Sequence, residues 1–527
     1  MVSTPIEIVT EPAGDWFDSS CALDLELLRR ERRGIHAAHS PELSVVPREP
    51  NYFGGFVTYT HSGPWGYTQE VPLLLYGPGF IKSQGDLTLD REPTLADMAP
   101  TVAELLGVPF PEDRPGVALS EALVPEDQRS RPPKVVLTIV WDGGGWNVLD
   151  AWPDAWPNLK RLMEEGTSVA NTIAGSAPSV TPAIHANIGT GAFPKQHGIV
   201  DIPIRDDNGI GGAYQGRTPR YLEIPTLADL YDPMTGNAAK IGMFAYKSWH
   251  LGMIGHGAFI DEGDKDIAVI ADQGSQLVTN PKWYSLPSYL SDTPGFDKYR
   301  QEVDINDGQA DGKWLGHDLL DNPKDVRETP VWTLYQTKLL KTMLEREGFG
   351  QDPIGDLFYI NYKQVDEVGH AHNMLEPEVR DIVEYADGEL KAMVEWLDRH
   401  VGKRQWVVML TADHGQGPDP LRSGAWPIRI QFLKEDIGDA FQVDPEELFD
   451  DHRPGSFWVN DEVMAREGIT LEDLANFFID YRLEENLPPG EEIPDVYADR
   501  RDELIFSAAF PSREMGRVWH CATKDER

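Results

Sequence analysis

Short apolar runs alternate along the chain with longer stretches that have apolar residues at helical spacing. Runs with the length and composition of buried strands cover residues 71–76, 135–141, 240–246, 356–362 and 405–411. Amphipathic stretches typical of helices cover residues 94–106, 157–165, 331–347 and 377–400. Strands that alternate with helices form a mostly parallel sheet with helices on both faces. The pattern therefore predicts an α/β fold built as a three-layer sandwich.

Polar residues follow three of these predicted strands. Asp142 follows one strand directly, Asp413 and His414 follow another, and Asp366 lies a few residues beyond a third. A single Asp in such a place can equally be a turn former or a helix cap. Because the carboxyl ends of parallel strands share one edge of a sheet, the three groups together predict a ligand site at that edge.

Two long stretches have the character of insertions. One covers about residues 206–322 and is rich in Gly, Asp and Pro, and the other covers about residues 418–500. We interpret both as cap-like insertions. A Ser-Arg-Pro-Pro-Lys sequence marks residues 126–134 as a linker between a first part, residues 1–125, and a second part, residues 135–527.

The charge balance restricts the partners of the protein. The chain has 527 residues, with 87 Asp and Glu against 47 Lys and Arg, and a formal net charge of -40. Bulk nucleic acid is excluded as a partner, since a polyanion requires a basic surface. A small phosphate compound can still bind an acidic protein where metal cations dominate the local field.

The ends of the chain bear on location and on cysteine chemistry. No basic region followed by an apolar run occurs at the N-terminus, and no eighteen apolar residues follow one another, so we expect a cytoplasmic protein with no membrane partner.

Cys21 and Cys521 are the two cysteines, and we expect neither a disulfide framework nor a metal-binding CxxC pattern from them. The sequence assigns them no role, and it does not indicate the oligomeric state.

Carboxylates and imidazoles are the ligands that divalent cations need, and a two-metal site draws them from several strand ends. Asp142 lies in a Trp-Asp-Gly-Gly-Gly sequence, and Asp413 and His414 are adjacent. Asp366 and His370 are four positions apart, so on a helix both side chains face one ion. Together these residues predict a metal site.

Thr181 is the candidate nucleophile. It lies in Ser179-Val180-Thr181-Pro182, and Pro182 at the first helical position would make Thr181 the N-cap. An anion is favoured beside the free amides of a helix N-terminus, and a nearby cation would lower the pKa of the hydroxyl. The alternative is that Thr181 only caps a helix.

These segments resemble the alkaline phosphatase superfamily, in particular its branch of nucleotide pyrophosphatases/phosphodiesterases and related phosphatases with a Thr nucleophile. The matching segments are 141–143, 179–185, 197–199, 366–370 and 411–415. The resemblance implies an alkaline phosphatase-like fold with cap insertions and a small phosphate-ester substrate. It also implies two divalent metal ions, with zinc expected and manganese or iron as alternatives.

The resemblance further implies which residues hold each ion. Asp142, Thr181, Asp413 and His414 would surround one ion, and Asp366 and His370 the other. Thr181 would attack phosphorus to form a phospho-threonine, which water would then hydrolyse.

The family also has a histidine ligand near its C-terminus, and the last residues of this chain lack the pattern. The pattern occurs near the N-terminus instead, as His61 in Thr-His-Ser-Gly-Pro-Trp-Gly-Tyr, followed by an apolar run and by 93–107, which resembles the family's closing helix. We infer that the chain is circularly permuted and that residues 1–125 supply the C-terminal element of the catalytic domain. The alternative is an ordinary surface histidine in an unrelated N-terminal domain.

Two residues are candidates for substrate contacts. Lys247 falls where related monoesterases have a phosphate-binding Lys, although the Arg expected two positions later is Trp249. Arg205 could replace an Asn that many nucleotide pyrophosphatases have, but a surface salt bridge is the alternative.

We therefore expect a metal-dependent hydrolase of phosphate esters, either a phosphodiesterase/nucleotide pyrophosphatase or a phosphatase. A phosphomutase or phosphonate hydrolase of the same superfamily and a non-catalytic, metal-stabilised binding protein are the alternatives. A sulfatase is disfavoured, because Thr181 lacks the Cys/Ser-x-Pro-x-Arg context of a sulfatase nucleophile.

Overall fold

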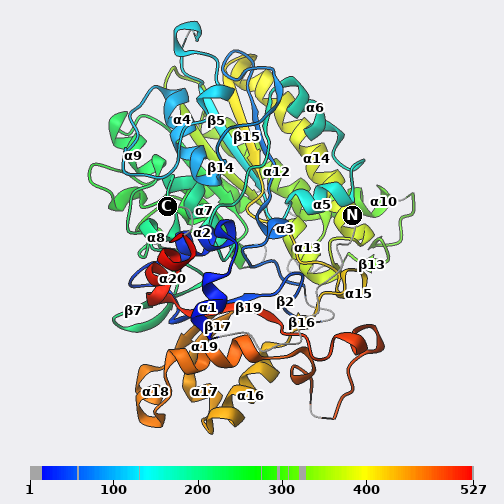
Figure 1. Ribbon diagram of the computed structural model, residues 1–527. Coiled ribbons are helices and arrows are strands. Elements are labelled where there is room, and N and C mark those ends of the chain that lie inside the picture. The colour runs from blue at the N-terminus through cyan, green and yellow to red at the C-terminus, as the bar shows by residue number, and fades with distance from the viewer. Residues whose placement is uncertain are drawn as a thin grey trace.

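The structure, a computed structural model, describes residues 15–55, 59–129, 131–273, 276–292, 297–306, 308–319, 328–488 and 490–524. Among these residues a nine-stranded sheet forms the centre of the molecule (Figure 1). In spatial order its strands are β11 (Gln276–Val278), β10 (Ile267–Gln273), β9 (Ile241–Ala245), β14 (Asp356–Tyr362), β5 (Val135–Trp141), β15 (Trp406–Thr411), β3 (Leu73–Tyr76), β6 (Thr167–Val169) and β4 (Gly85–Leu87).

The centre of this sheet is parallel, and its strands end in register. β14 and β15 both pair with β5, with Tyr362 opposite Trp141 and Thr411 opposite Val140. Each strand consists of buried residues throughout, as expected for strands with helices on both faces. The residues that follow these three strands therefore meet at one edge of the sheet.

The strand β3, from the N-terminal part of the chain, enters this sheet in the opposite direction. It pairs antiparallel with β15, and its first residue, Leu73, lies opposite Thr411, the last residue of β15. The segment before β3 therefore reaches the same edge as the residues that follow β15.

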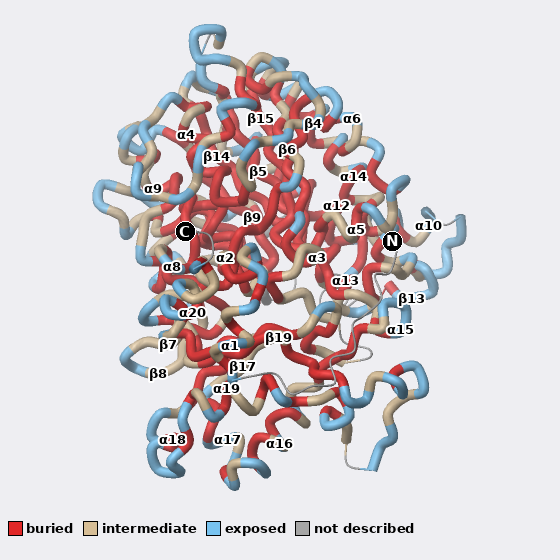
Figure 2. Tube along the Cα trace, in the orientation of Figure 1, coloured by how far each residue is buried: buried red, intermediate tan, exposed pale blue. Residues whose placement is uncertain are grey.

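Helices cover both faces of the sheet. One face packs against α5 (Trp146–Ala151), α6 (Pro157–Glu165), α12 (Pro330–Arg346) and α14 (Pro377–Leu397), and the other against α4 (Met98–Leu106), α7 (Thr181–Thr190) and α9 (Leu227–Met234) (Figure 1). Along β5, Leu137 and Ile139 join the first core, whereas Val136 and Val140 join the second. Figure 2 shows buried chain through the sheet and exposed chain in the outer turns.

A second, smaller body packs below the carboxyl edge. The described residues form an antiparallel sheet in the order β17 (Phe449–Arg453), β18 (Ser456–Val459), β1 (Leu43–Pro47) and β19 (Phe506–Pro511), with its own buried core. Helices α16 (Ile430–Phe441), α19 (Leu471–Asp480) and α20 (Met515–Ala522) belong to this body, as does α1 (Trp16–Cys21) (Figure 1). The two ends of the chain are thus built into one sheet.

A disulfide joins the two ends of the chain. Cys21, at the end of α1, is bonded to Cys521 in α20, with a Cα–Cα distance of 5.7 Å. We expected no disulfide framework and assigned these cysteines no role, and the bond corrects that expectation, because only the folded chain brings together residues 500 positions apart. Disulfides persist in oxidising compartments, so this bond weighs against the cytoplasmic location that we expected.

The predicted strands and helices agree with the observed ones, and the two stretches interpreted as cap-like insertions contribute to both bodies of the molecule. The stretch 206–322 supplies β9, β10 and β11 to the central sheet, and 418–500 forms the smaller body together with both chain ends. Within the expected linker 126–134, Ser130 lies outside the described residues, and the Lys134 N–H donates to the Gln405 carbonyl.

None of the helices in the described part of the chain combines the length and the apolar character that crossing a bilayer would require.

Candidate metal and nucleophile site

The seven residues expected at the metal site lie together at the carboxyl edge of the central sheet. Asp142 directly follows β5, and Asp413 and His414 follow β15. Asp366 and His370 lie on α13 (Gln364–His372), Thr181 begins α7, and His61 lies in the segment before β3. The structure therefore joins residues from five separate segments of the chain.

Asp142, Asp413 and His414 form the first group of possible ligands. All three are fully buried. His414 Nε2 lies 3.6 Å from Asp142 Oδ1 and 3.3 Å from Asp413 Oδ2. The Gly143 N–H donates to Asp413 Oδ1 at 3.1 Å, which orients the other oxygen, Oδ2, toward His414.

His61, Asp366 and His370 form the second group. His61 Nε2 lies 3.5 Å from Asp366 Oδ1, and His370 Nε2 lies 3.3 Å from the same oxygen. The rings of His61 and His414 stack with centroids 3.5 Å apart, so the two groups adjoin. The Nε2 atoms of His61, His370 and His414 are thus all directed toward carboxylate oxygens.

Main-chain carbonyls contact the other ring nitrogen of each histidine. His414 Nδ1 contacts the Gly415 carbonyl at 2.9 Å, His61 Nδ1 contacts the Ser179 carbonyl at 3.3 Å, and His370 Nδ1 contacts the Tyr59 carbonyl. A carbonyl at Nδ1 favours the tautomer in which Nε2 is the free ligand atom, as is usual for metal-binding histidines.

Local backbone geometry brings the two groups together. Gly143 has φ +71°, and a Cβ there would lie 2.9 Å from the Asp366 Cα, so only glycine allows β5 and α13 to approach so closely. α7 begins at Thr181, with Val180 as its N-cap, so the expectation that Thr181 is the N-cap was wrong by one residue. The Thr181 side chain still lies at the helix N-terminus.

Lys363 is a site residue that sequence reasoning missed. Its ammonium is 2.7 Å from Asp142 Oδ1, 2.7 Å from Asp366 Oδ2 and 3.0 Å from Thr181 Oγ1. The side chain is 2% exposed. The available signal was its position directly after β14, at the edge from which the other site residues come.

Asn361 and His185 also support the site. Asn361 Nδ2 donates to Asp142 Oδ2 at 2.8 Å, and His185 Nδ1 lies 2.8 Å from the Thr181 carbonyl and 3.6 Å from Asp413 Oδ2. Both side chains are fully buried. Their contacts hold the carboxylates and the first turn of α7 in position.

Burial and mutual repulsion disturb the pKa values of the site. Burial and the neighbouring Asp413 raise the pKa of Asp142 to about 6. Burial raises the pKa of Asp366, but His370 and Lys363 outweigh it and hold that pKa well below its usual value. Burial lowers the pKa of His370, yet Asp366 outweighs it and raises the pKa to about 9. Carboxylates this close together need compensating positive charge.

Of the two expected substrate contacts, Lys247 lies next to the site and Arg205 has other partners. Lys247 Nζ pairs with Glu367 Oε1 at 2.7 Å, and Glu367 follows Asp366. Arg205 forms ion pairs with Glu42 at 2.8 Å and Asp450 at 3.0 Å, neither of which belongs to the two ligand groups. The structure therefore favours the salt-bridge alternative for Arg205.

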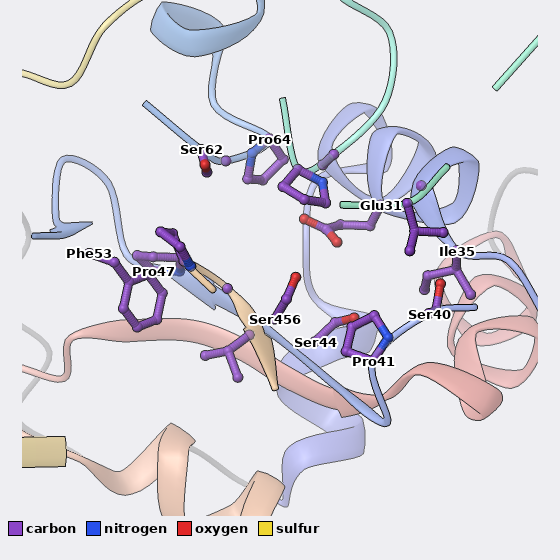
Figure 3. A pocket seen from close by; sticks show the side chains of 18 residues that line it. Glu31, Ile35, Ser40, Pro41, Ser44, Pro47, Phe53, Ser62, Pro64 and Ser456 are labelled. Carbon is purple, nitrogen blue, oxygen red and sulfur yellow. The ribbon is translucent and has the colours of Figure 1, made fainter. Parts of the chain in front are cut away.

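A cavity lies beside the site, between the larger and smaller bodies (Figure 3). Ser62 and Pro64, which follow His61, line it together with Pro41, Ser44 and Ser456 from the smaller body. Figure 3 shows the carboxyl group of Glu31 turned into this cavity. Burial raises the pKa of Glu31 to about 8.

The donor atoms of the two groups fit a divalent cation. Asp366 Oδ1, Asp413 Oδ2 and His414 Nε2 are buried and have no hydrogen-bond partner among the described residues. Buried polar atoms without partners are costly, and carboxylate oxygen and imidazole nitrogen are the usual ligands of zinc and similar ions. The groups His61–Asp366–His370 and Asp142–Asp413–His414 are each close enough to hold an ion.

Known proteins with similar sequences are phosphate-processing enzymes by name. A calcium-transporting ATPase of Myroides odoratus is 22% identical over 436 residues, which cover 72% of this chain and 73% of that protein. Alkaline phosphatase PafA of Elizabethkingia meningoseptica is 24% identical over 330 residues, covering 54% of this chain and 60% of PafA. The crystal structure of wild-type PafA has a TM-score of 0.54 at 19% identity, covers 73% of this chain and 84% of that one, and thus shows a shared fold.

The family model of type I phosphodiesterase / nucleotide pyrophosphatase matches residues 136–520, which include α7, α13, β15, all of β5 except Val135, and every expected site residue except His61. His61 and β3 lie outside the matched span. The match covers most of the chain. The protein therefore belongs to the type I phosphodiesterase/nucleotide pyrophosphatase family, within the alkaline phosphatase superfamily, and is a hydrolase acting on phosphoric ester bonds.

Proposed function

We propose that the protein hydrolyses a small phosphate ester through a phospho-threonine on Thr181, at a site that needs divalent metal. The observation that carries this proposal is the position of Thr181 Oγ1. Thr181 begins α7, and Lys363 links its hydroxyl oxygen, 3.0 Å away, to the buried carboxylate of Asp142, 2.7 Å away. A hydroxyl that only caps a helix would need no such surroundings.

The proposed reaction has two steps, attack by Thr181 and hydrolysis by water. The Thr181 oxygen bonds to phosphorus as the bond to the leaving oxygen breaks, while the hydroxyl proton passes to solvent and the leaving oxygen gains one. Water then bonds to phosphorus and loses a proton to solvent, while the bond to Thr181 breaks and the Thr181 oxygen regains a proton. Divalent metal bound at the carboxylate and imidazole groups would supply positive charge for the attacking and leaving oxygens. The amides at the start of α7 favour the anionic phosphate.

We propose zinc as the metal, with manganese or iron as alternatives, because both groups combine imidazole with carboxylate. Two ligand groups would suit two ions. Lys363 stands between the groups, however, and bears on the number of ions bound.

The proposed circular permutation is supported by the place of β3 and by His61. β3 lies within the central sheet beside β15, and His61 Nε2 lies 3.5 Å from Asp366, although both precede the span that the family model matches. The bond between Cys21 and Cys521 brings the two ends of the chain together, which is the condition for rearranging them. Residues 1–125 would then supply the C-terminal element of the catalytic domain.

The proposed function is tested by nitrophenyl phosphate monoester and diester hydrolysis with metal-loaded wild type, Thr181→Ala and Thr181→Ser. We expect Thr181→Ala to lose turnover by at least roughly a thousandfold while metal content and folding stay the same. Thr181→Ser keeps a hydroxyl and should retain part of the activity. Near-normal hydrolysis by Thr181→Ala would remove the phospho-threonine, and the faster substrate of the two would identify a diesterase or a monoesterase.

A further inference from the structure

Lys363 directs its ammonium group into the middle of the site. An ammonium has three protons, and Asp142 Oδ1, Asp366 Oδ2 and Thr181 Oγ1 are three acceptors within hydrogen-bond distance. Asp142 and Thr181 come from the group expected to hold one ion, and Asp366 from the group expected to hold the other. The lysine therefore links the two groups.

These contacts use the atoms that a metal ion would need on the Asp142 side. Asp142 Oδ1 and Thr181 Oγ1 accept from Lys363, and Asp142 Oδ2 accepts from Asn361 at 2.8 Å. Both oxygens of Asp142 are thus engaged by nitrogen donors. An ion bound to Asp142 and Thr181 would have to share their oxygens with an ammonium, and two cations repel each other at that distance.

Three buried atoms at the site, Asp366 Oδ1, Asp413 Oδ2 and His414 Nε2, have no hydrogen-bond partner among the described residues. The Nε2 atoms of His61 and His370 lie 3.5 Å and 3.3 Å from Asp366 Oδ1. His414 Nε2 is 4.0 Å from the same oxygen and 3.3 Å from Asp413 Oδ2, so it adjoins both groups. One ion placed among these atoms would satisfy them together.

The charge balance of the buried site favours the same conclusion. Asp142, Asp366 and Asp413 carry three negative charges and are each at most 2% exposed. One divalent ion and the ammonium of Lys363 together supply three positive charges. A second divalent ion would leave a buried excess of positive charge, which is costly unless further anions enter.

We propose that the ammonium of Lys363 takes the place of the metal ion expected between Asp142 and Thr181, so that the resting protein binds one divalent ion, at Asp366, His370 and His61. This inference rests on the proposed function and revises its metal count. Lys363 then acts as a fixed cation beside the nucleophilic hydroxyl of Thr181. The single divalent ion is then the only cation of the site that can bind and dissociate.

The test is the number of zinc ions per chain, measured by elemental analysis and by native mass spectrometry on full-length protein dialysed after loading with zinc. We expect one ion in the wild type and two in Lys363→Ala or Lys363→Ser, which open the space and remove the competing charge. Lys363→Arg, which keeps the charge, should bind one. Lys240→Ala is the matched control, because Lys240 pairs with Asp352 at 2.7 Å, and neither residue belongs to the ligand groups.

Two ions in the wild type would overturn the inference whether or not the variants fold, as would no ion at all. One ion in the wild type and also in both Lys363→Ala and Lys363→Ser would overturn it too. Hydrolysis measured on the same samples separates the two proposals. A wild type with one ion and no hydrolysis would remove the proposed function and leave the inference about Lys363 standing.

Discussion

Glu31 offers a test of the structure away from the metal ligands. It lies on α2 (Leu25–Gly34), is 8% exposed and lines the cavity between the two bodies. Burial raises its pKa from 4.5 to about 8. Because the folded state holds the proton more tightly, the carboxyl costs no stability below pH 4.5. It destabilises the fold progressively as the pH rises from 4.5 to about 8.

The size of this effect follows from the pKa difference. Each pKa unit corresponds to about 1.4 kcal/mol, so ionisation of Glu31 should lower the free energy of unfolding by roughly 3 to 5 kcal/mol at pH 9 relative to pH 4. Glu31→Gln keeps the shape and cannot ionise. We therefore expect the difference in the free energy of unfolding between Glu31→Gln and wild type to be larger at pH 9 than at pH 4 by roughly 3 to 5 kcal/mol.

The measurement is urea unfolding of wild type and Glu31→Gln at several values from pH 4 to pH 9, comparing midpoints at constant slope. Glu26→Gln is the control, because Glu26 is exposed on the same helix. If the wild type and Glu31→Gln lose stability in parallel as the pH rises, then Glu31 is not buried as described, and the packing of α2 against the smaller body is wrong.

Two further predictions concern His61 and the disulfide bond between Cys21 and Cys521. His61→Ala should weaken zinc binding at least roughly tenfold and slow hydrolysis strongly, since it removes one of the nitrogens near Asp366 Oδ1; an unchanged zinc affinity would refute both the ligand role and the permutation. Cys21→Ser should lower the free energy of unfolding by about 2 to 5 kcal/mol, because the bond closes a loop across 500 residues. Thermal unfolding of Cys21→Ser and wild type, in reducing and in oxidising buffer, measures this loss of stability. Equal stability of the two proteins in oxidising buffer would contradict the prediction.

The amino-acid sequence alone predicted the elements and most of the site. The strands 135–141 and 356–362 occur with the predicted bounds, because a run of apolar residues is a local property. Asp142, Asp366 and Asp413 could be grouped for a similar reason, since parallel strands bring their carboxyl ends to one edge whatever the remaining topology.

Tertiary structure decided what depends on partners far along the chain. The smaller sheet pairs β1 with β19, Cys21 bonds to Cys521, and Arg205 pairs with Glu42 and Asp450. Lys363 is the clearest case. By sequence it is one charged residue after a strand, and only the folded chain shows three acceptors around it, from the residue after β5, from α7 and from α13. Hydrophobic periodicity specifies which face of an element is buried, but a buried charge takes its role from side chains that other segments bring to it.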